Sequence, residues 1–132
     1  MTNSVGESAA VVVFIRDLIF ETKIRSTAGT IGIPVRCVRT VTELKNAIRA
    51  TPLAVIVDLN ASPDSVDVVL AAVQVPPDLP ADQRPWRVTA FVSHVDQSLA
   101  DAALAAGADE VLPRSRFVQE LPNILGRSKD RL

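Results

Sequence analysis

The stretch Leu53-Ala54-Val55-Ile56-Val57, followed directly by Asp58, is apolar at every position. An uninterrupted run of this kind, rich in β-branched residues, is typical of a strand buried on both faces, as in the middle of a parallel sheet. Two further runs have the same character, Val11–Ile15 and Val88–Val92. Two weaker runs bring the number of expected strands to five, at residues 34–38 and 110–112.

Segments with the apolar spacing of helices separate these strands. Thr40-Val41-Thr42-Glu43 is a capping box, which predicts that a helix begins there, and Pro52 follows its end. The other expected helices are Leu18 to about Thr30, Ser65–Val73, Gln97–Ala106 and a last one over Phe117–Leu125 that Pro122 kinks or restarts. Because strands and helices alternate along the chain, the sequence predicts an α/β fold: a five-stranded parallel sheet, (βα)5, with helices on both faces.

The composition limits the class of protein. The 132 residues, 48% of them hydrophobic, suit one globular domain, and a net charge of -1 gives no basic field for direct nucleic-acid binding. The longest apolar run, Ala9–Ile15, is too short to span a membrane, and the polar first residues do not resemble a secretory signal. The single Cys37 cannot form an internal disulfide. We therefore expect a cytoplasmic protein without a membrane partner.

The sequence also indicates the limits of the domain. Residues 1–9 are expected to form a flexible N-terminus, 10–125 the domain, and 126–132 a polar C-terminal tail without a following effector domain. A proline-rich loop at 75–87 holds four of the nine prolines and ends near the only tryptophan, Trp86. This loop is either an insertion without a role or a recognition element.

Polar residues follow the expected strands, where parallel folds of this class bind their ligands. They include two carboxylates, a hydroxyl and two guanidinium groups that suit phosphoryl chemistry: Asp17, Asp58, Ser93, Arg16 and Arg114. The alternative is that these residues only begin loops and cap helices. His94 is the only histidine, so a cluster of several His and Cys ligands for a metal is excluded. Glycine-rich phosphate loops are also absent, which disfavours a nucleotide or flavin site.

The arrangement resembles the receiver domain of bacterial response regulators, a flavodoxin-like module, over nearly the whole chain. In that family an acidic pair ends the first strand and holds magnesium, and here Arg16-Asp17 stands there. The phosphoacceptor aspartate is matched by Asp58, the Ser or Thr after the fourth strand by Ser93, and the glycine-alanine turn by Gly107-Ala108. The resemblance implies that Asp17 and Asp58 would hold magnesium if it binds.

Several positions depart from the family pattern. Arg16 replaces the first acidic residue, Arg114 replaces the lysine after the fifth strand, and Val111 stands where a switching aromatic is common. Magnesium prefers oxygen ligands, so a neighbouring guanidinium should weaken its binding. The departures favour a degenerate receiver, or pseudo-receiver, without a required cofactor. We further expect Arg16 to form an ion pair with Asp58.

The resemblance implies a non-enzymatic signalling domain of the two-component, or phosphorelay, type that binds another signalling protein, such as a histidine kinase or an effector. The expected partner surface includes Arg114, Arg116 and Phe117 as exposed or half-exposed residues, in a monomer or homodimer. The alternative is a phosphorylatable response regulator that accepts phosphate on Asp58 and hydrolyses it again, with Arg114 as the cation.

Overall fold

A computed structural model describes residues 9–93 and 96–132 of the chain. Its sheet has five parallel strands in the order β2-β1-β3-β4-β5. The strands are β1 (Val11–Phe14), β2 (Val35–Val38), β3 (Ala54–Asp58), β4 (Arg87–Val92) and β5 (Glu110–Pro113). The three fully apolar runs of the sequence form the three central strands, which confirms the predicted parallel sheet.

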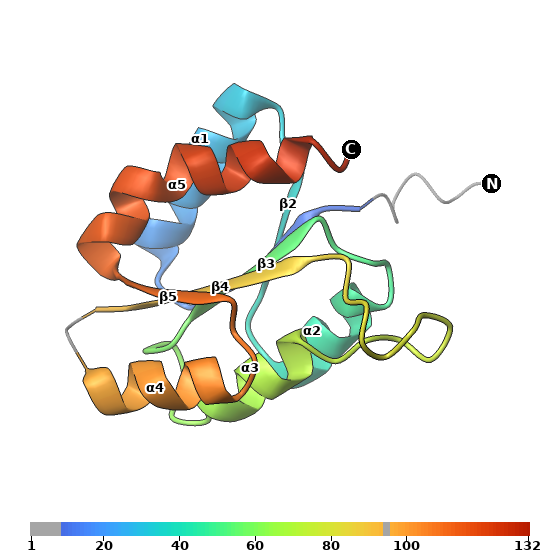
Figure 1. Cartoon of the computed structure of the whole chain (residues 1–132). Coiled ribbons are helices and arrows are strands. Elements are labelled where there is room, and N and C mark those ends of the chain that lie inside the picture. The colour runs from blue at the N-terminus through green and yellow to red at the C-terminus, as the bar shows by residue number, and fades with distance from the viewer. Residues whose placement is uncertain (1–8, 94–95) are drawn as a thin grey trace.

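Five helices cover both faces of the sheet, as predicted. They are α1 (Leu18–Ile31), α2 (Val41–Ile48), α3 (Ser65–Ala72), α4 (Gln97–Ala105) and α5 (Arg114–Lys129). Helices α1 and α5 lie side by side on one face, whereas α2, α3 and α4 lie on the other (Figure 1). Among the described residues, no helix is both long enough and apolar enough to cross a membrane.

The alternation of side chains along the strands divides the core into two layers. In β3, for example, Val55 and Val57 pack toward α2 and α3, whereas Ile56 packs toward α1 and α5. Strand β4 divides in the same way. Both faces of the central strands are thus buried in apolar layers, which explains why their sequences show no polar alternation.

Local signals fix several helix ends. The Thr40 hydroxyl accepts a hydrogen bond from the Glu43 amide, and the Glu43 carboxylate accepts one from the Arg39 amide, so the capping box forms with its return bond one residue earlier than the usual pattern. Helix α1 ends at Gly32, whose φ of 88° is left-handed and favours glycine.

The C-terminal segment differs from the predicted polar tail over residues 126–132. Helix α5 runs through Pro122 without interruption and continues to Lys129, and Ser128 is buried. Arg131 Nη1 donates hydrogen bonds to the backbone carbonyls of Pro52 and Leu53. Contacts with the body of the domain, which the local sequence does not reveal, therefore order this segment. Of the predicted flexible N-terminus, residues 1–8 lie outside the described part of the chain.

The proline-rich loop is attached to the core by its tryptophan. Trp86 is only 2% exposed, and its indole N–H donates to the Ala72 carbonyl at 2.8 Å. It precedes β4 and therefore lies at the amino-terminal edge of the sheet, away from Asp58 at the end of β3. Trp86 is consequently a probe of core packing and is poorly placed to report on the Asp58 edge.

Candidate functional site

The carboxyl edge of the sheet brings together the predicted site residues. Asp17 lies between β1 and α1, Asp58 is the last residue of β3, and Ser93 follows β4. Arg114 is the first residue of α5, directly after β5. Because all strands are parallel, these four positions from distant parts of the sequence meet at one end of the molecule.

Asp58 is a buried carboxyl group, with 6% of the residue exposed. Burial raises its pKa, and this effect outweighs the hydrogen bond from the Asn60 amide to Asp58 Oδ1 at 2.9 Å and the nearby charge of Arg114. Asn60 also bridges to the next strand, since its side-chain oxygen accepts a hydrogen bond from the Ser93 amide at 2.6 Å. Sequence reasoning did not select Asn60; its place two residues after a strand-end aspartate is the only signal that could have drawn attention to it.

Asp17 has two different sets of partners. Its Oδ1 caps helix α1 by accepting hydrogen bonds from the amides of Ile19 and Phe20 at 3.0 and 3.1 Å. Its Oδ2 accepts a hydrogen bond from Arg114 Nη2 at 2.9 Å, which also forms an ion pair. The bond from Arg114 and then the bond from the Phe20 amide lower the pKa of Asp17. The capping role and a charged contact therefore coexist on this side chain.

An aromatic cluster positions Arg114. The guanidinium carbon lies 4.2 Å from the centre of the Phe20 ring, a cation–π arrangement. Phe20 meets Phe91 edge to face, and Phe91 stacks on Phe117 with 4.3 Å between ring centres. We call the contacts of Arg114 with Asp17 and Phe20 the Arg114 clasp.

The predicted ion pair between Arg16 and Asp58 is wrong. Arg16 is exposed, and its Nε and Nη2 donate to the backbone carbonyl of Arg39 at 3.4 and 3.2 Å. Ile15, directly before it, is fully buried, so the chain turns Arg16 outward toward the end of β2. The cation that engages a carboxylate of this edge is Arg114, and the carboxylate is Asp17.

The arrangement does not fit a divalent cation well. Both oxygens of Asp17 already accept hydrogen bonds, one of them from a guanidinium group, and Asp58 Oδ1 accepts another. Within residues 9–93 and 96–132, no group of three or more His, Cys, Asp and Glu side chains could hold a metal ion. A cation at this edge would compete with the positive charge of Arg114 for the same oxygens. His94 lies outside the described residues.

The expected partner surface is only partly exposed. Arg116 is exposed and Arg114 is half-buried, but Phe117 is completely buried. The prediction that Phe117 is exposed or half-exposed is therefore wrong. Its ring packs between α5 and the sheet because the spacing Phe117, Leu121, Ile124 forms the inner face of the helix.

Comparison with solved structures identifies the fold. A response regulator from Burkholderia pseudomallei, solved with a phosphorylated aspartic acid, a calcium ion and citrate, superposes with a TM-score of 0.70 at 20% identity, covering 94% of this chain and 71% of the other. The chain has the receiver-domain fold. This finding confirms the flavodoxin-like prediction.

Two other response regulator structures match over almost their full length. A response regulator receiver protein from Burkholderia phymatum has 24% identity and a TM-score of 0.63, covering 90% of this chain and 96% of its own. A chain described as a response regulator from Chloroflexus aurantiacus has 21% identity and a TM-score of 0.70, with coverages of 90% and 98%. No protein-family model matches the sequence, and no curated protein resembles it significantly in sequence.

Proposed function

We propose that this chain is a receiver-like signalling domain of the two-component type that acts by binding another protein, without the usual magnesium-dependent phosphoryl switch. The observation that carries the proposal is the Arg114 clasp. Arg114 Nη2 lies 2.9 Å from Asp17 Oδ2, so a side chain of the protein already supplies positive charge at this edge.

The physical argument concerns charge. A phosphoryl group on a carboxylate adds negative charge that a cation must offset, and in phosphoryl transfer this cation is commonly a divalent metal. Here both carboxylate oxygens of Asp17 already accept hydrogen bonds, one of them from Arg114. The aromatic ring of Phe20 restricts where the guanidinium of Arg114 can move. Arg114 thus offsets the charge of Asp17 within the protein itself, which favours a constitutive binding module.

The partner that fits this proposal is another signalling protein, such as a histidine kinase or an effector, met in the cytoplasm. Next to the site, Arg116 is exposed on the first turn of α5, and Leu18 and Ile19 are exposed on the first turn of α1. Such a surface suits a transient contact, in which rim charges guide association. The domain would act as a monomer or a homodimer.

The alternative is a response regulator that accepts phosphate on Asp58. Two observations favour it: Asp58 ends β3 at the ligand-binding edge of the sheet, and the similar protein from Burkholderia pseudomallei was solved with a phosphorylated aspartic acid. In this function the phosphoryl group of acetyl phosphate passes to an oxygen of Asp58 and acetate leaves. Arg114 would then have to release Asp17 and turn toward the phosphoryl group.

The two functions are separated by an NMR titration of the ¹⁵N-labelled protein. We expect magnesium at millimolar concentration, alone and with beryllofluoride or acetyl phosphate, to leave the amide signals of Asp17, Asn60 and Ser93 unchanged. Saturable shifts there that Asp58→Asn abolishes would establish the alternative instead.

A pair of variants tests the role assigned to the clasp. Arg114→Ala removes the internal cation, so we expect it to gain magnesium-dependent shifts at Asp17 that the wild-type protein lacks. Arg116→Ala, two residues along the same helix, serves as the matched control and should behave as the wild type does. An unchanged magnesium response in Arg114→Ala would show that the clasp does not exclude the ion.

A further inference from the structure

The opposite edge of the sheet holds a second group of charged side chains. There the amino-terminal ends of β3 and β4 meet the last turns of α5, around a cavity of about 180 Å³. Arg87, Arg127 and Arg131 line it together with Thr89, and apolar side chains that include Leu53 and Ile124 complete the lining. This edge lies across the sheet from Asp58, so the site does not depend on the function proposed for Asp58.

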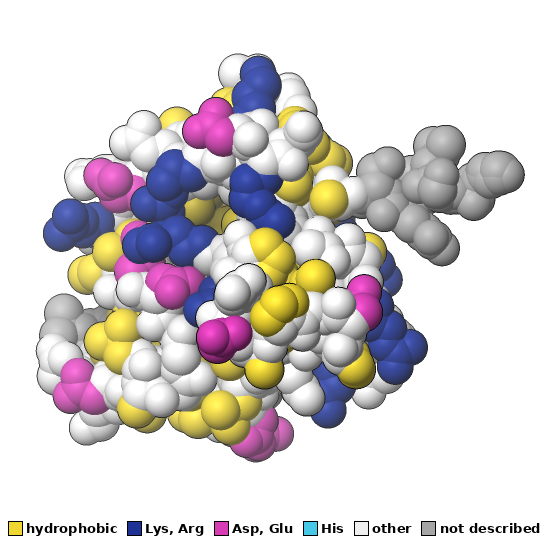
Figure 2. Space-filling model, turned by 45° about the vertical axis from the view of Figure 1, so that its right-hand side comes forward, with side chains coloured by type: hydrophobic (Ala, Val, Ile, Leu, Met, Phe, Trp, Pro, Cys, Tyr) yellow, Lys and Arg dark blue, Asp and Glu magenta, His cyan; other side chains and the backbone are white. Residues whose placement is uncertain are grey.

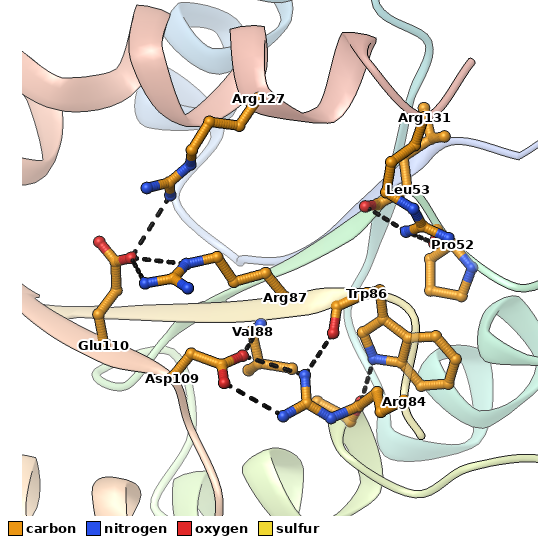
Figure 3. A network of polar contacts seen from close by, with 11 residues as sticks. Pro52, Leu53, Arg84, Trp86, Arg87, Val88, Asp109, Glu110, Arg127 and Arg131 are labelled. Carbon is orange, nitrogen blue, oxygen red and sulfur yellow. Dashed lines mark hydrogen bonds and ion pairs between the residues drawn. The ribbon is translucent and has the colours of Figure 1, made fainter. Parts of the chain in front are cut away.

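Secondary-structure spacing brings these residues together. Arg87 and Thr89 lie two residues apart on β4 and therefore point to the same face of the sheet. Ile124 and Arg127 are three residues apart near the end of α5, so they lie on one side of it, and Arg131 follows two residues after the helix ends at Lys129. In Figure 3, Arg87 and Arg127 approach from one side and Arg131 stands on the other.

The positive charges exceed the negative charges in this cluster. Arg87 contacts Glu110 Oε2 through Nε at 2.9 Å and Nη2 at 2.7 Å, and Arg127 Nη2 reaches the same oxygen at 3.4 Å. Arg131 instead donates to two backbone carbonyls, at 2.8 and 2.6 Å. Two of the three guanidinium groups thus share the carboxylate of Glu110, and the third, that of Arg131, pairs with no carboxylate among the described residues. In the upper half of Figure 2, Lys and Arg side chains gather around a few acidic ones.

A buried hydroxyl group provides an independent indication of a ligand. Thr89 lines the cavity and is only 2% exposed. Its hydroxyl makes no hydrogen bond to any residue in the described part of the chain, whereas the Ser128 hydroxyl nearby donates to the Ile124 carbonyl. Buried polar groups nearly always have a hydrogen-bond partner. The Thr89 hydroxyl can meet this requirement by donating to an oxygen atom held inside the cavity.

We propose that this cavity, which we call the arginine pocket, binds a phosphate monoester with a short carbon chain. A dianionic phosphoryl group matches the excess of two positive charges, and guanidinium groups bind phosphoryl oxygens with planar, paired hydrogen bonds. The cavity is smaller than the roughly 300–1,000 Å³ typical of sites for drug-sized ligands, so only a small ligand fits. The apolar lining accommodates the carbon chain.

The test is an NMR and calorimetric titration of the full chain with propyl phosphate, inorganic phosphate and propionate at constant ionic strength. We expect saturable shifts at the amides of Thr89 and Arg127, strongest with propyl phosphate and weakest with propionate. Equal binding of propionate would overturn the phosphoryl assignment. Shifts that do not saturate, or that spread over all exposed arginines, would overturn the pocket itself.

Variants that are expected to change the affinity for propyl phosphate in opposite directions sharpen the test. Arg127→Gln and Thr89→Val should each weaken binding of propyl phosphate, by about tenfold for the loss of a charged hydrogen bond. Glu110→Gln should tighten binding, because it removes the carboxylate that competes for Arg87 and Arg127. Arg116→Gln, an exposed arginine at the other end of α5, is the control. Melting curves verify that each variant is folded, and identical affinities across the folded variants would contradict the proposal.

Discussion

At the scale of single residues, the site depends on how each carboxyl group is paired. Asp17 and Asp58 both end or follow a central strand, yet their environments are opposite. Asp17 accepts hydrogen bonds from a guanidinium and two amides, which lower its pKa, whereas Asp58 is buried and accepts a hydrogen bond from the Asn60 amide, and burial raises its pKa. The same residue type therefore serves as a charged helix cap in one position and as a buried acid with a raised pKa in the other.

The buried Asp58 carboxylate should reduce stability at neutral pH. Because its pKa is raised in the folded state, the folded protein binds the proton more tightly, and stability falls as the pH rises from the unfolded value of 3.8 through the native pKa. Asp58→Asn keeps an acceptor for the Asn60 amide and removes the charge. We expect a melting temperature a few degrees higher at pH 7, with the gain disappearing below pH 3.8.

Thermal melts of Asp58→Asn and wild type across this pH range check the prediction. Asp82→Asn, at an exposed position in the proline-rich loop, is the matched control and should change little at any pH. A gain for Asp58→Asn that is independent of pH would show that charge burial is not its cause.

The pKa of Asp17, in contrast to that of Asp58, is lowered, and it should rise when Arg114 is removed. Arg114 is the largest cause of the lowered value, so Arg114→Ala should move the Asp17 pKa back toward its ordinary value. The carboxyl carbon resonance of Asp17, followed during a pH titration by NMR, measures this directly. The same titration on Arg116→Ala should reproduce the wild-type curve, and an unmoved Asp17 pKa in Arg114→Ala would exclude the clasp in solution.

At the scale of elements, α5 shows how tertiary contacts extend a weak local signal. Its later part contains Pro122 and Gly126, both poor helix formers, and from the sequence its end resembles a polar tail. The inner face holds Phe117, Leu121, Ile124 and Leu125 against the sheet, so packing outweighs propensity. The helix then continues far enough to place Arg127, and just beyond its end Arg131, at the opposite edge of the sheet.

Glycine substitutions distinguish a real helix from a tail. A Cβ at Gly126 would meet nothing within 4 Å, so Gly126→Ala should stabilise the protein by about 0.5–1 kcal/mol through helix propensity. Gly32→Ala has equally open space, but its φ of 88° strains a Cβ, so it should destabilise. Chemical denaturation of both variants provides the measurement. No gain from Gly126→Ala would indicate that residues around it are not helical.

At the scale of the whole molecule, one sheet belongs to both halves of the core. Each central strand contributes alternate side chains to the α1/α5 layer and to the α2/α3/α4 layer. Neither layer can be lost without exposing the other face of the same strands. Cooperative, two-state unfolding follows from this arrangement.

Probes in the two layers should therefore report the same transition. Trp86 is buried in the α2/α3/α4 layer, and Ile24 and Ile124 are buried in the α1/α5 layer. We expect the urea midpoint from Trp86 fluorescence to coincide with that from the Ile24 and Ile124 methyl signals. Separate midpoints would contradict a single cooperative unit.

The sequence by itself determined the strands, their parallel pairing and the candidate edge, because buried central strands need continuous apolar runs and each run ends in a polar residue. Val11–Phe14, Ala54–Asp58 and Arg87–Val92 carry that information locally. It also indicated that Arg16 and Arg114 alter the charge of the edge.

Only the tertiary structure decided which arginine pairs with which acid, because that choice depends on the direction in which a side chain leaves the backbone. The same holds for Phe117, buried by the packing of α5, and for the arginine pocket, whose members are distant in sequence and meet only when the last helix crosses the sheet.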